Sequence, residues 1–298
     1  MAMPQPPTLI AAIERAALRL DEAGVAFGHG TTNAFDEAVW LVLWRLGLPL
    51  HDLDGVAARP LGDDESARID ALIDERIATR KPAAYLTGEA WLQGVPFHID
   101  ERSIVPRSLI AEVLAEGTLD ALLGREPERV LDLCTGNGSL AVLAALAWPQ
   151  ARIDASDISA DALALARRNV ARHGVADRVR LLQGDGLAAV EAVSGRYDLV
   201  LCNPPYVNAR SMAALPPEYR AEPALALAGG DDGMDFIRRL LPALPAYLNP
   251  GGALVLEIGH EREHFEAAFP GVEVLWLETS AGGEQVVWVE LVSVSHAP

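Results

Sequence analysis

Short apolar segments alternate with helical segments from Arg129 onward, and this alternation is the strongest constraint on the fold. The pattern predicts helices over 139–148 and 159–173, with Ser159 as N-cap of the second. Strands separated by helices of about 10 to 15 residues are typical of a parallel sheet covered on both faces. The predicted strands are residues 130–133, 151–156, 179–182, 197–201, 253–258, 273–277 and 285–291.

The first part of the chain has a different, helical periodicity. Apolar stripes with charged residues between them predict helices from residue 9 to about 80, including 35–46 and 64–80. Residues 91–99 read as two short strands around a glycine turn, and a helix is expected from 106 to about 123. We therefore expect a helical domain at 1–82, a β-hairpin linker at 83–108 and an α/β domain at 109–298.

The charge balance limits the classes of partner. The net charge is −18, Lys81 is the only lysine, and the arginines occur singly or in pairs. Without a basic stripe such a chain is repelled by phosphate backbones, so direct nucleic-acid binding is disfavoured and a basic protein partner is favoured. The sequence shows no secretory signal and no apolar run suited to a membrane, so we expect a cytoplasmic protein.

A glycine turn directly after the first α/β strand is the first candidate binding motif. Its pattern, D-x-x-x-G-x-G, lets the backbone approach a ligand and leaves N–H groups of the next helix free for it. It is neither a P-loop nor an NAD fingerprint, and a plain tight turn is the alternative. The candidate cofactor residues here are Asp132, Cys134, Thr135, Gly136, Asn137 and Gly138.

Two acidic residues follow the next two strands. Asp157 ends the second strand, roughly 20 residues after the turn, where a carboxylate accepts hydrogen bonds from two ribose hydroxyls. The alternative is an acid that stabilises a helix N-terminus. Asp185, after the third strand, is placed to accept from an adenine amino group, with a simple turn residue as the alternative.

The most specific motif is Asn203-Pro204-Pro205-Tyr206, which follows the fourth strand. The prolines stiffen the chain, and Pro205 has no N–H, so carbonyl groups remain free to accept. The Asn203 oxygen and the Pro204 carbonyl together suit the two hydrogens of a planar –NH₂ group, and Tyr206 offers a ring face. If the sheet is doubly wound, with strands added on both sides of the first strand, then the first and fourth strands are neighbours. This turn and the glycine turn then face one crevice. The histidines have no set of metal-ligand partners, so no metal site is expected.

These two motifs together resemble an S-adenosylmethionine-dependent amino-methyltransferase. Residues 97–108, Phe-His-Ile-Asp-Glu-Arg-Ser-Ile-Val-Pro-Arg-Ser, narrow the resemblance to the HemK/Prm family of protein glutamine N5-methyltransferases. Release-factor enzymes of that family typically read Pro-Arg-Pro-Glu-Thr-Glu where this chain reads 106-Pro-Arg-Ser-Leu-Ile-Ala-Glu. That difference and the segment after Tyr206 are similar to the branch, of PrmB type, that methylates large-subunit ribosomal protein L-three.

The resemblance implies a fold, a cofactor and residue roles. The fold would be a class I methyltransferase, a seven-stranded Rossmann-like sheet, and the helical domain would recognise the substrate. Residues 134–138 would line the methionine part of S-adenosylmethionine, Asp157 would hold the ribose and Asp185 would lie near the adenine. Asn203 and Pro204 would hold the glutamine amide, with Tyr206 packed on it. Gly186 departs from relatives that have a larger apolar or aromatic residue beside the adenine.

Three other functions remain open from the sequence. A release-factor methyltransferase shares the chemistry and differs only in partner. A nucleic-acid amino-methyltransferase acting on adenine N6 or guanine N2 would use the same –NH₂ recognition, with Tyr206 stacked on a flipped base. A non-catalytic ribosome assembly factor would bind the cofactor without transferring its methyl group.

Overall fold

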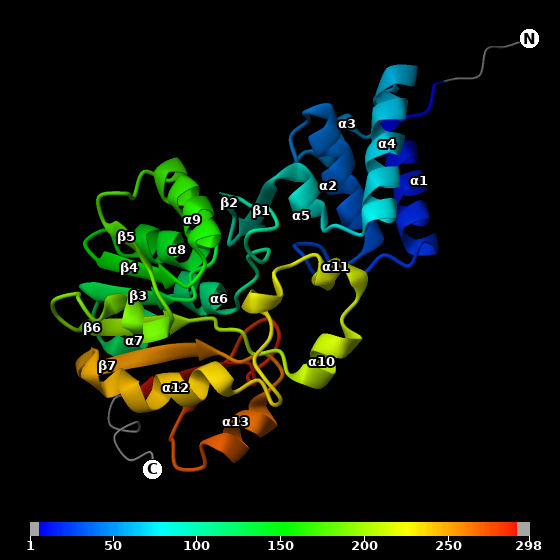
Figure 1. The fold of residues 1–298 in the computed structure, drawn as a ribbon. Helices are drawn as coiled ribbons and strands as arrows, with labels where there is room; N and C mark the ends of the chain where they lie inside the picture. Colours follow the sequence, from blue (N-terminus) through cyan, green and yellow to red (C-terminus); the bar gives the residue numbers. More distant parts are fainter. Residues whose placement is uncertain (1–5, 291–298) are drawn as a thin grey trace, which may run out of the picture. The chain divides into compact units, whose positions relative to one another are not determined.

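The structure is a computed structural model that describes residues 6–290, and it divides into two compact units (Figure 1). The first unit comprises residues 6–89 together with Leu215–Ala221, a short segment from much later in the chain. The second unit comprises Ala90–Ala214 and residues 222–290.

The first unit is a helical bundle in which α1, α2 and α4 contact one another. Thr8 accepts a hydrogen bond from the Ala11 N–H and caps α1, and Asn33 caps α2 in the same way. The apolar faces of the helices form one buried core. The helices of this unit are α1 (Leu9–Glu22), α2 (Ala34–Leu46), α3 (Leu53–Val56), α4 (Asp63–Thr79), α5 (Ala83–Thr87) and α11 (Pro217–Arg220).

Buried charges join α11 to this bundle. Arg76 of α4 is fully buried and pairs with Glu37 of α2 at 2.8 Å. Glu218 of α11, also fully buried, pairs with Arg80 at 2.7 Å and with Arg76 at 3.5 Å. Removing one partner of such a cluster leaves a buried charge uncompensated, so Glu218 holds the Leu215–Ala221 segment in the first unit.

The second unit is built on a sheet of seven strands with the order β5-β4-β3-β6-β7-β9-β8. The strands are β3 (Arg129–Leu133), β4 (Arg152–Asp157), β5 (Val179–Gln183), β6 (Tyr197–Cys202), β7 (Leu248–Glu257), β8 (Leu275–Leu277) and β9 (Val286–Glu290). The first five in chain order, β3 to β7, pair with one another in parallel, as predicted. β9 pairs antiparallel with both β7 and β8, so the prediction of a wholly parallel sheet is wrong at this edge. Residue 291 of the predicted last strand lies outside the described residues.

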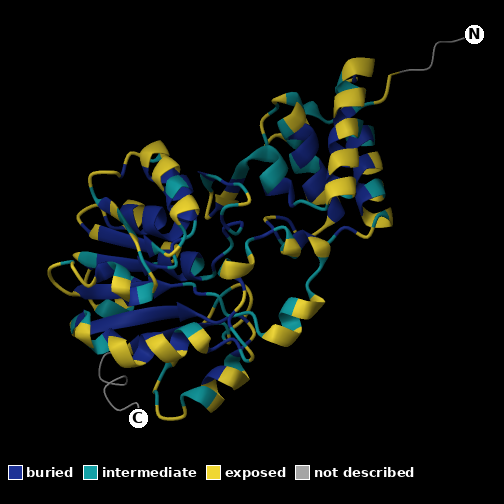
Figure 2. Ribbon diagram, in the orientation of Figure 1, coloured by how far each residue is buried: buried dark blue, intermediate teal, exposed yellow. Residues whose placement is uncertain are grey.

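Helices cover both faces of this sheet, and the strands between them are buried (Figure 2). Because side chains alternate along a strand, Val130 joins one core and Leu131 the other. The remaining elements are the expected hairpin of β1 (Glu89–Leu92) and β2 (Val95–His98), the helices α6 (Ile110–Ala115), α7 (Thr118–Leu123), α8 (Ser139–Ala147), α9 (Ala160–Arg172), α10 (Ala209–Ala214), α12 (Asp235–Ala243) and α13 (Arg262–Ala268), and the 3₁₀ turns η1 (Gly186–Val190), η2 (Ala224–Ala226) and η3 (Leu244–Ala246).

The single helix expected from 106 to 123 is wrong. The chain forms α6 and α7 instead, separated at Gly117, whose φ of +73° places it in the left-handed region. A residue in that conformation ends a helix, and glycine adopts it without a steric cost. The segment before α6 is not helical, and it contributes to the site described next.

Candidate active site

The sheet register brings the two sequence motifs together. β3 and β6 are adjacent and parallel, and Leu133 lies opposite Cys202. The residues that follow these two, Cys134 and Asn203, therefore leave the sheet side by side at its carboxyl edge. This confirms the expectation that the first and fourth strands are neighbours, and it places both motifs where open α/β sheets bind ligands.

The turn after β3 depends on left-handed backbone. Gly136 has φ +56°, and a Cβ added there would lie 2.8 Å from the Ser103 Oγ, so only glycine fits. Cys134 also has positive φ, +59°, which is costly for a side chain with a Cβ. The resulting turn exposes backbone close to a cavity, as the glycine pattern predicted.

Asp132 supports this turn from behind. Its fully buried carboxylate accepts hydrogen bonds from the Thr135 hydroxyl at 2.5 Å and from the Ala141 N–H of α8 at 3.0 Å. Burial raises the pKa of the Asp132 carboxyl to about 7. The sequence counted Asp132 among the cofactor contacts, but the structure turns its carboxylate toward the loop and the helix.

Asp157 lies at the end of β4 and faces the same turn. One carboxylate oxygen accepts from the Gly136 N–H and the other from the Ser159 N–H, each at 2.9 Å. Burial raises the pKa of Asp157 above its usual value, while these backbone hydrogen bonds oppose the rise. Each carboxylate oxygen has a second acceptor position, so Asp157 can still accept from a ligand.

Asn203 is a polar side chain whose own hydrogen-bonding capacity is unused. Within residues 6–290 its carboxamide has no hydrogen-bond partner, and the Pro204 carbonyl also accepts no hydrogen bond there. Asn203 lines a cavity of about 220 Å³ and a smaller one of about 30 Å³ beside it. The turn therefore offers two free acceptors. Asn203 brings one of them to the cavities, whereas Pro204 and Tyr206 line neither of the two.

Three glycines from other segments pack closely against this turn. A Cβ on Gly233 would lie 2.2 Å from the Tyr206 carbonyl oxygen, and one on Gly259 would lie 2.4 Å from the Tyr206 ring. A Cβ on Gly229 would lie 2.8 Å from both the Pro205 carbonyl oxygen and the Tyr206 Cα. Side chains at these positions would displace the turn, so its position relative to the sheet is tightly determined.

Two buried acids bind the non-helical segment before α6, and one of them, Glu257, also binds this turn. Glu257 accepts from the Tyr206 hydroxyl at 3.2 Å, from the Ser108 hydroxyl at 2.5 Å and from the Leu109 N–H at 2.9 Å. Burial raises the pKa of Glu257 and that of Tyr206. Glu222 accepts two hydrogen bonds of 2.7 Å from the Arg107 guanidinium. Neither acid was recognised from the sequence, because its partners are remote in the chain.

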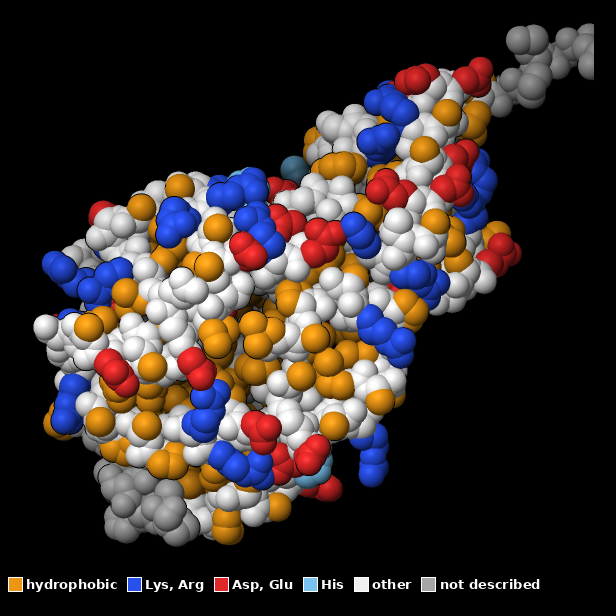
Figure 3. All heavy atoms as spheres, viewed as in Figure 1, with side chains coloured by type: hydrophobic (Ala, Val, Ile, Leu, Met, Phe, Trp, Pro, Cys, Tyr) orange, Lys and Arg blue, Asp and Glu red, His pale blue; other side chains and the backbone are white. Residues whose placement is uncertain are grey.

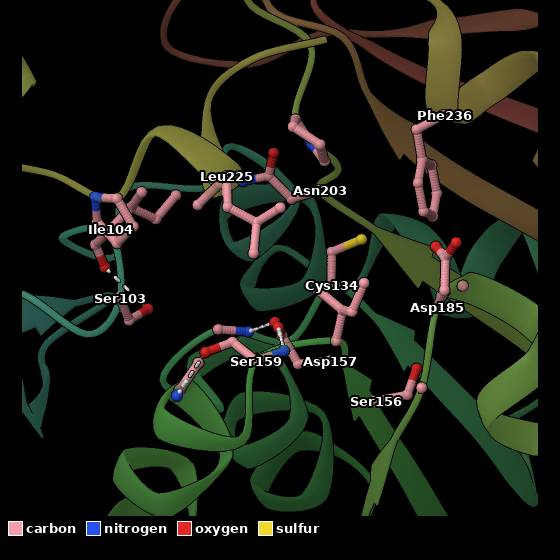
Figure 4. A pocket seen from close by; sticks show the side chains of 18 of the residues that line it. Ser103, Ile104, Cys134, Ser156, Asp157, Ser159, Asp185, Asn203, Leu225 and Phe236 are labelled. Carbon is pink, nitrogen blue, oxygen red and sulfur yellow. Dashed lines mark hydrogen bonds between the residues drawn. The ribbon is translucent and has the colours of Figure 1, made fainter.

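The larger cavity gathers predicted residues from four different loops (Figure 4). Cys134 and Asn203 lie near its middle, Asp157 lies below them, and Asp185 lies at one end. Gly136 and Pro205 line it as well. The smaller cavity is bounded by Thr135 and Asn137, and by residues 103, 104 and 106–108. Gly138 instead packs against α9, where its absent Cβ would lie 3.0 Å from Ala166.

Several residues that line the larger cavity were not predicted from the sequence. Ser103 and Ile104 come from the segment before α6, Leu225 from η2, and Phe236 and Arg239 from α12. Each is an ordinary residue type, and nothing in its local pattern separates it from a core or surface position. Only residues 103 and 104 carried a signal, because they lie in the segment on which the family resemblance rests.

Asp185 is held by Arg239 rather than left open. The guanidinium bonds both carboxylate oxygens, at 2.7 and 3.2 Å. These hydrogen bonds lower the pKa of Asp185 below its usual value. Asp185 therefore remains charged near neutral pH, and its ion pair forms part of the cavity lining.

Neither a metal-binding cluster nor a membrane-spanning helix is found among the described residues. Over the described part of the chain, no group of three or more His, Cys, Asp and Glu side chains could hold a metal ion. No helix among residues 6–290 is long and apolar enough to cross a membrane.

Comparisons with known proteins show the family of the chain. Residues 111–215 match the family model of the methyltransferase small domain, and residues 11–88 match that of the PrmC N-terminal domain. The chain is 56% identical to the ribosomal protein uL3 glutamine methyltransferase of Bordetella pertussis, over 94% of each chain. It is 49% identical to the protein of that name from Burkholderia pseudomallei, over 96% of this chain and 94% of the relative.

A solved structure supports the fold. A methyltransferase from Pyrococcus furiosus matches with a TM-score of 0.50 at 21% identity, over 67% of this chain and 89% of that one. At this identity the likeness concerns the arrangement of strands and helices alone.

Proposed function

The chain belongs to the family of ribosomal protein uL3 glutamine methyltransferases, and we propose that it methylates the side-chain amide nitrogen of a glutamine in uL3. It is a methyltransferase of class I fold with S-adenosylmethionine as its cofactor. We further propose that it acts in the cytoplasm. The observation that carries the proposed chemistry is the free carboxamide of Asn203 at the cavity edge.

The residues around the larger cavity fit the cofactor. Bound S-adenosylmethionine supplies an electrophilic methyl group on a sulfonium sulfur. Asp157 accepts hydrogen bonds from the ribose hydroxyls with the acceptor positions that Gly136 and Ser159 leave free. The turn from Cys134 to Gly138 holds the methionine part, and the end of the cavity at Asp185 receives the adenine. Asp132 and Thr135 act by keeping the turn in shape.

Asn203 and Pro204 orient the substrate amide. An amide nitrogen is a poor nucleophile because its lone pair is delocalised into the carbonyl group. Two acceptors that bind both N–H hydrogens aim this nitrogen and favour the positive charge that develops on it. Orientation of this kind is worth about 7–11 kcal/mol in well-aligned reactions. No dedicated base is required, because the methylated cation is acidic and loses its proton to water.

Tyr206 positions the flat face of the amide. Its hydroxyl is held by Glu257 and its ring is backed by Gly259. Burial raises the pKa of Tyr206, so the phenol stays protonated and continues to donate to Glu257. The ring is therefore a fixed surface against which the amide packs, while Pro205 keeps the turn stiff.

The transfer reaction itself tests the proposal. We would incubate the full chain with tritium-labelled S-adenosylmethionine and, in parallel, with unmethylated uL3, unmethylated release factor and ribosomal RNA. Tandem mass spectrometry would locate the label. We expect label on a glutamine side chain of uL3 only.

The other outcomes separate the alternatives. Label on the release factor alone would keep the chemistry and change the partner. Label on RNA alone would make the chain a nucleic-acid amino-methyltransferase. Figure 3 disfavours that outcome, since Lys and Arg side chains on this face are interspersed with acidic ones. Cofactor binding without transfer to any substrate would leave the assembly-factor function.

The helical unit is proposed as the part that recognises the protein substrate. Its largest exposed hydrophobic side chains are Leu18 of α1, 58% exposed, and Phe35 of α2, 40% exposed. Aromatic anchors commonly carry much of the binding energy in protein recognition, which Phe35 can supply, and Leu18 adds apolar area.

We expect the double variant Leu18→Ser, Phe35→Ser to raise the KM for uL3 about tenfold, the loss typical of an interface anchor. The KM for a short glutamine peptide should stay unchanged, because a peptide of that size lacks the wider docking surface. Leu275→Ser, which removes an exposed leucine from β8 of the second unit, is the control. An unchanged KM for uL3 in the double variant would show that Leu18 and Phe35 do not take part in binding uL3.

A further inference from the structure

The loop after β5 lacks a side chain at the end of the cavity, and a helix supplies one. Residue 186, next to Asp185, is a glycine and so has no side chain to fill this place. In the structure Phe236 of α12 lies beside this place, because a Cβ added to Gly186 would be in ordinary van der Waals contact with the Phe236 ring carbons Cε2 and Cζ, at 3.5 and 3.6 Å. Phe236, Gly186 and Asp185 all line the cavity, and Figure 4 shows Phe236 and Asp185 together at one end of it.

We propose that Phe236 is the flat wall against which the adenine of the cofactor packs, in place of the side chain absent at Gly186. This inference rests on the cofactor of the proposed function and adds a specificity-determining residue to it. Aromatic rings stack on the face of any base, so a phenyl ring at this end of the cavity suits the planar purine.

The ring is held in place from two sides. Its helix is anchored by Met234 and Ile237, both fully buried in the core. The Arg239 guanidinium lies 5.6 Å from the ring centroid while it bonds Asp185. Such a cation over a ring face is attractive, so the ion pair keeps the ring oriented at the cavity end.

Phe236 lines a second cavity as well as the first. The second cavity, of about 220 Å³, shares Asp185, Gly186, Phe236 and Arg239 with the first. Beyond them it is lined by residues that include Leu240 and Tyr247. Removing the Phe236 ring would take a flat face from the cavity end that receives the adenine, and Tyr247, which lines only the second cavity, is a position for a control.

Calorimetric titration with S-adenosylhomocysteine tests this role without a turnover measurement. We expect Phe236→Ala to weaken binding by about 10- to 100-fold, the loss typical of one base-stacking ring. Phe236→Tyr should bind within about threefold of the unaltered chain, because it keeps the flat face. Phe236→Leu should lose most of the affinity although it keeps apolar volume, which separates a stacking role from a packing role.

Two controls decide the outcome. Tyr247→Ala, in the second cavity only, should leave the affinity unchanged. The compound 5′-methylthioadenosine, which has the adenosine but no amino-acid part, should lose affinity for Phe236→Ala by the same factor as S-adenosylhomocysteine. Equal binding by Phe236→Ala and the unaltered chain, or equal losses in Phe236→Ala and Phe236→Tyr, would overturn the inference. An unaltered chain that binds neither compound would instead contradict the cofactor of the proposed function.

Discussion

Replacing Asn203 by alanine is expected to lower kcat by about a thousandfold while binding of S-adenosylhomocysteine stays within about threefold. The carboxamide has no hydrogen-bond partner among the described residues, so its removal breaks no contact that holds the turn. The turn keeps its position through the prolines and through Gly229, Gly233 and Gly259. The loss therefore falls on orientation of the substrate amide, measured by single-turnover methyl transfer at saturating uL3.

Asn249→Ala is the matched control for this variant. It removes the same group, but Asn249 bonds Asp198 near the opposite, amino-terminal end of β6. Its kcat should be close to that of the unaltered chain. A near-normal kcat for Asn203→Ala would refute the mechanism, whereas parallel losses of kcat and cofactor affinity would show that Asn203 serves mainly the cofactor.

Replacing Asp157 by alanine should weaken S-adenosylhomocysteine binding by about a hundredfold or more. Two hydrogen bonds from ribose hydroxyls to a charged acceptor are lost, and each is typically worth about 1.5–3 kcal/mol. The variant also removes the acceptor for the Gly136 N–H, so the cofactor turn loses a support. Calorimetry measures the affinity, and thermal unfolding checks that the fold persists.

Asp161→Ala is the control, because Asp161 is an exposed acid in the first turn of the helix that follows Asp157. The pH dependence provides an independent check. Burial raises the pKa of Asp157, and hydroxyl donors favour its ionised form, so affinity should fall as pH is lowered through that pKa. In Asp157→Ala this part of the pH dependence should disappear. An affinity of Asp157→Ala equal to that of Asp161→Ala would exclude the ribose role.

The segment after Tyr206 links the two units through the chain itself. Val207 pairs with Ala228, so the segment leaves and returns to the second unit close to the Asn203 turn. Between these points, Glu218 is buried with Arg76 and Arg80 of the first unit. The loop that follows the proposed substrate-binding turn is thus partly an element of the proposed recognition unit.

Local patterns were sufficient for most of the second unit. The periodicity of apolar residues located each strand, and Ser159 was recognised as an N-cap from its position before an amphipathic helix. The helix boundary at Gly117 was missed, because glycine within a helical pattern does not by itself show a left-handed turn. The strand β9 was predicted but its antiparallel direction was missed, since strand direction depends on how the preceding chain crosses the sheet.

The sequence by itself determined the sheet with its helical N-terminal part, and the two motifs that follow β3 and β6. These features are encoded locally, in the spacing of apolar residues and in turns that need glycine or proline. Only the tertiary structure decided which remote side chains complete the site. Glu257 joins Tyr206 to Ser108, and Phe236 occupies the space beside Gly186. The physical reason is that packing and hydrogen bonding between remote segments depend on distances that no local pattern contains.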